Sequence, residues 1–322
     1  MKYSGIGGQA VIEGVMMKNK DKYAVAVRKP DGEIEIKTDE YKGVADKSKL
    51  FRFPIIRGVV NFIDSLVLGM STLSYSSSFY EEEEDGKEVD AAKKEKNDKI
   101  VGVITIIIAV VMAIGIFVVV PWLISDYVFT RFIDSLTVRT LLEGILRLAM
   151  FIGYVSLISL MKDIKRVYMY HGAEHKCINC IEHGLDLTVE NVKKSSKEHK
   201  RCGTSFMLIV MCFSILLLML IRFDSRWLRM LARLALIPVI AGFSYEFLRF
   251  AGTHDNKFIN IISRPGLWLQ GLTTKEPDEK MIEVGIASVE AVFDWKKYIS
   301  ENFEDRKDEC KDSNQDSGDT TV

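Results

Sequence analysis

An uncharged run at residues 100–124 is the feature that most constrains this chain. Isoleucine, valine and other apolar residues fill it, and no Asp, Glu, Lys or Arg interrupts it. A helix of this length covers the roughly 30 Å hydrocarbon layer of a bilayer, where backbone groups must be satisfied within the segment itself. The run therefore predicts a membrane-spanning helix, with Pro121 and Trp122 near its far interface.

Three further apolar runs predict more spans, at 141–161, 205–221 and 234–250. The run at 141–161 contains Glu143 and Arg147, whose i,i+4 spacing lets the two charges pair and lowers the cost of inserting them. We therefore expect an α-helical polytopic membrane protein with about four transmembrane helices.

Soluble segments flank the predicted spans. Near the start, YAVAVRK and EIEIK alternate apolar and polar residues around the turn Lys29-Pro30-Asp31-Gly32, which predicts a β-hairpin. Residues 50–79 repeat apolar positions every three or four residues, but polar side chains interrupt them too often for a full span. We divide the chain into a β-rich cytoplasmic domain (1–49), an amphipathic membrane-associated helix (50–79), a charged linker (80–99), a four-span membrane domain (100–250), a cytoplasmic segment with a C-terminal amphipathic helix (251–303) and a disordered tail (304–322).

The distribution of positive charge predicts the orientation. The loop between the second and third spans, 162–204, is rich in Lys and Arg. By the positive-inside rule this loop and both termini face the cytoplasm of a cell-membrane, multi-pass protein. The opposite loop carries regularly spaced arginines, which predict a short helix snorkelling at the interface: Arg222, Arg226, Arg229 and Arg233.

Composition excludes several classes of protein. A formal net charge of -1 argues against nucleic acid as a general partner. Five cysteines scattered over the chain do not form a disulfide framework, and no cleavable signal peptide is expected at the start.

The segment YHGAEHK, residues 170–176, carries the strongest chemical signal. In a helix His171 and His175 stand one turn apart on one face, with Glu174 beside them. This H-x-x-E-H order matches the inverzincin arrangement, in which two imidazoles bind zinc and the glutamate handles protons. The alternative is a polar juxtamembrane helix whose histidines contact lipid headgroups or a helix end. Gly172 within the motif weakens the helix.

A metal site needs a third ligand, and the sequence offers several without choosing between them: His199, Cys202, Glu246 and His254. Arg201 suits either an anionic group of a substrate or a positive-inside anchor. Cys177 and Cys180 form a C-x-x-C pair, which has a redox role, contacts the metal or is incidental.

Five blocks resemble the DUF1385 family, the YqhQ-like membrane proteins of bacteria: GGQAVIEGVMM, HGAEHK, HKRCGTSF, AGFSYEFLRFAG and PGLWLQGLTTKEPDEKMIEV. The resemblance implies a multi-pass membrane protein described as a predicted metal-dependent enzyme, with its function otherwise unassigned. The resembling blocks contain Glu13, His171, Glu174, His175, His199, Arg201, Cys202, Glu246 and Arg249. The family pattern has no cysteine at 177 and 180 in most members, which weakens a general role for that pair.

We expect a membrane-embedded, metal-dependent hydrolase with a divalent metal ion, zinc, at the cytoplasmic membrane boundary. His171 and His175 bind the metal, Glu174 is the general base, and His199, Cys202 or Glu246 completes the ligands. Arg201 binds substrate, which is a lipid, a lipid-linked intermediate or a membrane peptide. The alternative is a non-enzymatic scaffold or metal-regulated adaptor with protein partners at the cytoplasmic face.

Overall fold

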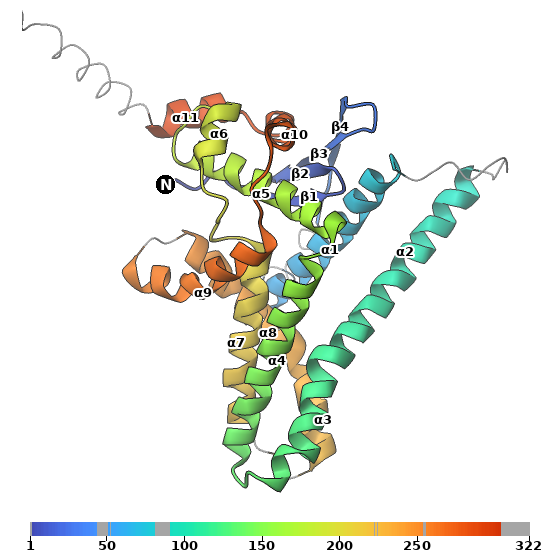
Figure 1. The fold of residues 1–322 in the computed structure, drawn as a ribbon, viewed down its shortest axis with the longest axis vertical. Helices are drawn as coiled ribbons and strands as arrows, with labels where there is room; N and C mark the ends of the chain where they lie inside the picture. The colour runs from blue at the N-terminus through green and yellow to red at the C-terminus, as the bar shows by residue number, and fades with distance from the viewer. Residues whose placement is uncertain are drawn as a thin grey trace, which may run out of the picture.

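The computed structural model describes residues 2–43, 51, 53–80, 91–221, 223, 225–253 and 256–303. These residues form two layers: a group of long helices below, and a small sheet with shorter helices above (Figure 1). The predicted combination of a largely helical chain with a small N-terminal sheet is therefore present. The predicted tail and His254 lie outside the described residues, as do residues 81–90 of the predicted linker.

The sheet is an antiparallel meander in the order β1-β2-β3-β4, formed by β1 (Ile6–Val11), β2 (Gly14–Asn19), β3 (Lys22–Arg28) and β4 (Ile34–Glu40). The hairpin predicted from the Pro-Asp-Gly turn is β3–β4, closed by the pair Arg28 and Ile34. GGQAVIEGVMM forms a second hairpin, in which Glu13 occupies the turn with a φ of 50°. Glu13 pairs there with Arg166 and accepts a hydrogen bond from the Tyr170 hydroxyl at 3.2 Å.

The long helices are α1 (Ile56–Ser77), α2 (Ala91–Ile114), α4 (Leu136–Ile158), α7 (Gly203–Leu220) and α8 (Arg226–Thr253). A short π-helical turn, Gly115–Val119, joins α2 to α3 (Val120–Tyr127), and a 3₁₀ turn, Phe129–Arg131, follows α3. Within the described residues, five helical stretches are long and apolar enough to cross a membrane. Four correspond to the predicted spans, and α1 is the fifth.

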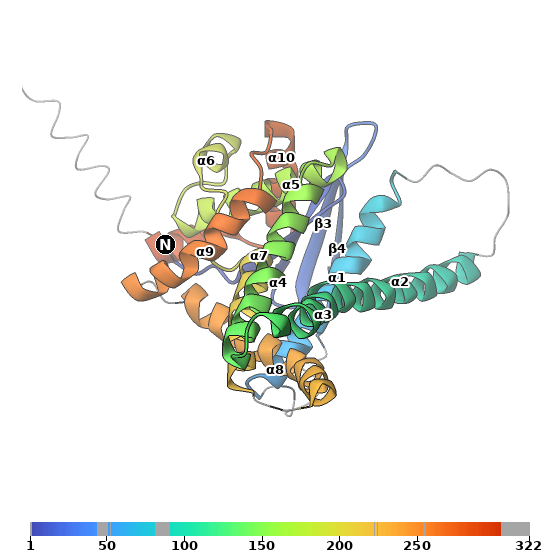
Figure 2. The same cartoon turned by 60° about the horizontal axis from the view of Figure 1, so that its bottom comes forward.

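Helix α1 connects the two layers. At its start Gly58 packs against Gly242 of α8, where a Cβ at position 58 would lie 2.9 Å from the Gly242 Cα. Past its middle Leu68 joins the apolar cluster under the sheet, and at its end the Ser76 hydroxyl accepts the Ile12 amide at 3.1 Å. Figure 2 shows α1 running from α8 to the strands. Both ends of α1 are thus packed against protein.

A buried charge cluster joins α4 to α8 in the half of the helical layer that lies farther from the sheet. Glu143 pairs with Arg147 at 3.0 Å, as the i,i+4 spacing predicts, and also with Arg233 of α8 at 2.6 Å. Arg229 pairs with Asp126 at 3.0 Å. The predicted snorkelling of these arginines is therefore wrong for Arg229 and Arg233, because burying Glu143 and Asp126 nearby requires charged partners.

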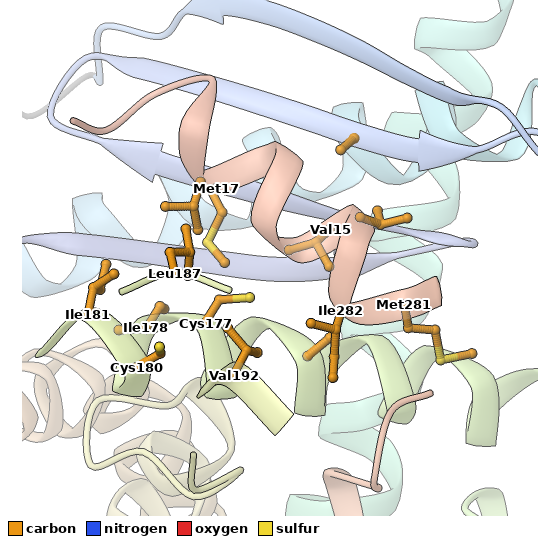
Figure 3. Close-up of a cluster of buried hydrophobic side chains, with 14 of the residues drawn as sticks. Val15, Met17, Cys177, Ile178, Cys180, Ile181, Leu187, Val192, Met281 and Ile282 are labelled. Carbon is orange, nitrogen blue, oxygen red and sulfur yellow. The ribbon is translucent and has the colours of Figure 1, made fainter. Parts of the chain in front are cut away.

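The upper layer contains α5 (Lys162–Glu182), α6 (Val189–Lys194), α9 (Lys257–Thr273), α10 (Glu279–Glu290) and α11 (Trp295–Phe303). The predicted C-terminal helix is thus two helices, α10 and α11. Figure 3 shows α5 and α10 packed on the sheet through Met17, Cys177, Ile178 and Ile282. Cys177 and Cys180 are fully buried in this core, so their structural role is apolar packing.

Candidate metal centre

Helix α5 brings His171 and His175 together on one face, with ring centroids 4.4 Å apart. The helix is continuous through Gly172. A Cβ at this glycine would lie 2.0 Å from the carbonyl oxygen of Lys275, because the segment leading into α10 crosses the helix there. Gly172 is therefore required by a close approach of two backbones, and its low helix propensity is offset by packing.

Cys202 supplies the third side chain of the cluster. It is the N-cap of α7, and its Sγ lies 3.3 Å from His171 Nε2. One ligand atom from each of His171, His175 and Cys202 lies within 4.8 Å of the other two. In a tetrahedral zinc site, bonds of about 2.0–2.3 Å place ligand atoms roughly 3.3–3.8 Å apart. The separations in the cluster, all within 4.8 Å, exceed this spacing by about 1 Å at most.

Backbone carbonyls orient both imidazoles. His171 Nδ1 donates to the carbonyl oxygen of Thr273 at 3.0 Å, and His175 Nδ1 donates to that of Lys197 at 2.7 Å. When Nδ1 carries the proton, Nε2 carries the lone pair that a metal binds. The two carbonyls therefore select the tautomer in which both Nε2 atoms could bind a metal.

The loop before Cys202 is held in place by polar side chains that the sequence analysis did not select. Lys176, buried on α5, donates to the carbonyl oxygens of Lys193 and Ser195 at 2.9 and 2.8 Å. One turn later, Asn179 donates to those of Ser196 and Glu198. From α9, Gln270 accepts the His199 amide at 2.9 Å and donates to the His199 carbonyl oxygen at 2.8 Å. The signal for these contacts in the sequence was that two polar residues, Lys176 and Asn179, interrupt the apolar second half of α5.

Glu174 lies beside the cluster with a carboxylate oxygen, Oε2, that is buried and has no hydrogen-bond partner among the described residues. Burial raises the pKa of Glu174 to about 7, against the opposing effects of His171 and a hydrogen bond from the Gly8 backbone. A Cβ at Gly8 would lie 2.9 Å from Glu174 Cγ, so this approach of β1 to α5 requires glycine. Glu174 can hold or release a proton near neutral pH.

His199 and Arg201 both pair with Glu182, a residue that was not among the candidates from the sequence. His199 Nε2 lies 3.4 Å from Glu182 Oε2, and Arg201 forms a salt bridge with Oε1 of the same carboxylate. Burial raises the pKa of Glu182, but these partners and Ser4 outweigh it and bring the pKa to about 2. The pKa of His199 is lowered, mainly because its imidazole is buried. The structure thus places His199 next to the cluster, as a partner of Glu182.

Glu246 lies away from the cluster. Its carboxylate forms a salt bridge with Arg57 of α1 at 2.6 Å, at the contact between α1 and α8. The expectation that Glu246 faces the metal is therefore not met, because the packing of Gly58 on Gly242 brings Arg57 to it first.

A cavity of about 470 Å³ opens onto the cluster. Strand β1 borders it through Gly7 and Gly8, and both histidines, Glu174 and Cys202 line it. The three candidate ligand residues therefore border an open space, a feature that catalytic zinc sites share.

Comparison with known proteins identifies the family. Residues 53–295 match the family described as "Protein of unknown function (DUF1385)". The chain belongs to this family. It is 36% identical over 294 residues to the "Uncharacterized protein YqhQ" of Bacillus subtilis (strain 168), covering 88% of this chain and 90% of that protein. No solved structure matches the chain.

The DUF1385 match covers the residues that build the cluster. It includes α5, the loop that carries Cys202, and α9 with Gln270, and it starts after the sheet. The ligand candidates and the carbonyls that orient them therefore lie within the family region, whereas Gly8 precedes it.

Proposed function

We propose that this DUF1385 protein is a membrane-embedded, metal-dependent hydrolase whose zinc ligands are His171, His175 and Cys202. The convergence of these three side chains on one cavity carries the proposal, since one ligand atom of each lies within 4.8 Å of the others. Zinc enzymes commonly use three protein ligands and leave one position open for water or substrate. The carbonyl contacts of both Nδ1 atoms add the orientation that such ligands need.

The roles of the neighbouring residues follow from their positions. Zinc bound there would supply a water that ionises near neutral pH and would polarise the substrate. Glu174, buried at the edge of the cavity with one unpartnered oxygen, is placed to accept a proton and return it to the leaving group. Arg201 reaches the same cavity, where its Nη2 pairs with Glu182 and its Nη1, without a hydrogen-bond partner among the described residues, is placed to donate to an anionic substrate.

A structural zinc in an adaptor protein is the rival proposal. Structural sites are closed, with four protein ligands. The described residues bring three ligand atoms together and leave a cavity beside them, so the enzyme is favoured.

We place the site at the cytoplasmic face of the cell membrane, with four full spans and both termini inside. The charge distribution supports this orientation. The second half of α1 packs under the sheet, which leaves too little of this helix to cross a bilayer. The cluster lies where α7 begins, at the boundary between the two layers.

The test is the zinc content of detergent-purified protein after zinc reconstitution and removal of unbound metal. We expect about one zinc per chain, lost in His171→Ala, His175→Ala and Cys202→Ala. His183→Ala is the matched control, since this histidine ends the same helix and lies outside the cluster. Thermal unfolding of each variant separates loss of zinc from loss of fold. Equal zinc in all variants, or none in the wild type, would contradict the proposal.

A further inference from the structure

The metal cavity shares a lining residue, Ser65 of α1, with two other cavities. One, of about 430 Å³, is mostly apolar and lies among α1, α4, α7 and α8. The other, of about 530 Å³, is more polar and lies between the start of the sheet and α1. Ser65 lines all three cavities. Gly203 and Thr204 also border the apolar and metal cavities, and Arg201 borders the metal and polar ones.

The apolar cavity belongs to the helices that qualify as membrane spans. It is lined by the side chains Phe62, Phe151, Val155, Phe206, Met207 and Leu248, among others. Phe62 comes from α1, and the others lie towards the ends of α4, α7 and α8 nearest the metal cluster. A hydrocarbon chain entering from the bilayer would exchange lipid surroundings for this lining and reach the metal cavity without crossing water.

The polar cavity beside the metal cavity is lined by slightly more cationic than acidic side chains, and one of the cations, Arg201, also pairs with Glu182. Lys18, Lys20 and Arg201 line it, together with Asp21 and Asp64, and the Tyr41 hydroxyl donates to Asp64 at 3.2 Å. Arg201 stacks over the Tyr3 ring at 4.2 Å, and its Nη1 is buried without a hydrogen-bond partner among the described residues. An anionic group is the natural partner for that nitrogen.

Strand β1 does not favour a peptide substrate, although it is an edge strand. A peptide added there would need the outward amides of β1. The Ile6 amide already donates to the Ser4 hydroxyl at 3.3 Å, and the Ile12 amide that follows β1 donates to Ser76 at 3.1 Å. The Gly8 backbone amide is hydrogen-bonded to the Glu174 carboxylate.

We infer that the substrate is an amphiphilic lipid with its hydrocarbon chain in the apolar cavity, its anionic head beside Arg201, and its scissile bond between them at the metal cluster. This rests on the proposed hydrolase. Water adds across the bond: its hydroxyl goes to the carbonyl carbon or phosphorus, and its proton, carried by Glu174, goes to the departing oxygen.

The probe is a 12-carbon alkyl phosphate with a diazirine at the chain end, photolysed in the full-length protein in nanodiscs. We expect labelling within the cavity-lining stretches around Phe151 and Phe206. Ser65→Trp places a bulky side chain at the residue that the three cavities share, and it is expected to reduce this labelling about tenfold. Ser71→Trp is the matched control, an exposed serine on the same helix that does not line these cavities.

The head is tested with the matching diazirine alcohol, which has no charge. Arg201→Gln is expected to reduce labelling by the phosphate about tenfold and leave labelling by the alcohol unchanged, while Arg201→Lys retains most of the preference. Should Arg201→Gln unfold because Glu182 loses its partner, Lys18→Gln with Lys20→Gln makes the same comparison.

Labelling spread over α2 and insensitive to Ser65→Trp would overturn the inference. So would competition by an extended apolar peptide in place of dodecyl phosphate, which would assign the cavity to membrane peptides. Zinc is measured in the same samples. Specific labelling without zinc binding would remove the hydrolase and leave the lipid site, whereas zinc binding without specific labelling would remove only the lipid site.

Discussion

Replacing Gly172 with alanine tests whether the crossing segment positions the metal ligands. Helix propensity alone predicts that Gly172→Ala stabilises α5 by about 1 kcal/mol. The structure predicts the opposite sign, since the added Cβ would lie 2.0 Å from the Lys275 carbonyl oxygen. That contact is more than 1 Å too short, so the segment must move away from the helix.

The cost of this movement can be worked out from the contacts it breaks. Overpacking of this kind costs about 1–3 kcal/mol. The Lys275 amide donates to the Tyr168 carbonyl oxygen at 2.9 Å, and losing this hydrogen bond adds about 1 kcal/mol to the cost. After the gain in propensity, we expect a net loss of about 1–3 kcal/mol. The Thr273 carbonyl moves with the segment, so the orientation of His171 is lost and zinc affinity falls about 10–100-fold.

Two measurements check this prediction: the unfolding midpoint in denaturant and the zinc affinity by competition with a chelator. Gly271→Ala in α9 is the control, because a Cβ there meets open space and gains only helix propensity. If Gly172→Ala matched the wild type in stability and zinc affinity, the proposed role of the crossing segment would be wrong.

Three other substitutions test separate parts of the structure. Glu174→Gln should retain zinc and slow hydrolysis by about 10²–10⁴-fold, measured on a lipid ester; undiminished turnover would exclude Glu174 as the base. Glu182 has a pKa lowered from 4.5 to about 2, so its stabilisation is present above pH 4.5 and is lost as the pH falls towards 2. Glu182→Gln should therefore lose about 3 kcal/mol at neutral pH and flatten the stability profile in that window, as followed by unfolding against pH. Arg233→Met should cost about 3–5 kcal/mol by leaving Glu143 underpaired, whereas the more exposed Arg226→Met should cost less than about 1 kcal/mol; equal effects would contradict a structural role for the buried cluster.

The features predicted well from the sequence are those that depend on local pattern. An uncharged stretch such as 100–124 has few alternatives to a membrane helix, because water is absent from the bilayer core. The β3–β4 hairpin follows from its turn residues, and the shared face of His171 and His175 follows from helical geometry. These parts of the fold and site needed no knowledge of tertiary packing.

Which of the four candidates joins the two histidines could not be predicted, because distant contacts determine it. Cys202 reaches the histidines because Lys176, Asn179 and Gln270 hold the intervening loop by its backbone. Glu246 is occupied by Arg57 because two glycines let α1 approach α8. The regularly spaced arginines up to Arg233 indicated an interface. The carboxylates that pair with Arg229 and Arg233, however, lie about 90–100 residues earlier in the chain.

The position of Cys202 gives the cluster a role in joining the two layers. As the N-cap of α7, Cys202 accepts the Thr204 amide through its Sγ at 3.4 Å, so the same sulfur that faces the histidines also begins a helix long and apolar enough to cross a membrane. A metal held by His171, His175 and Cys202 would therefore tie α5 of the upper layer directly to α7 of the lower one. Because Gly203 and Thr204 also border the apolar cavity, any shift of α7 at this joint would change the ligand geometry and the entrance for the hydrocarbon chain together.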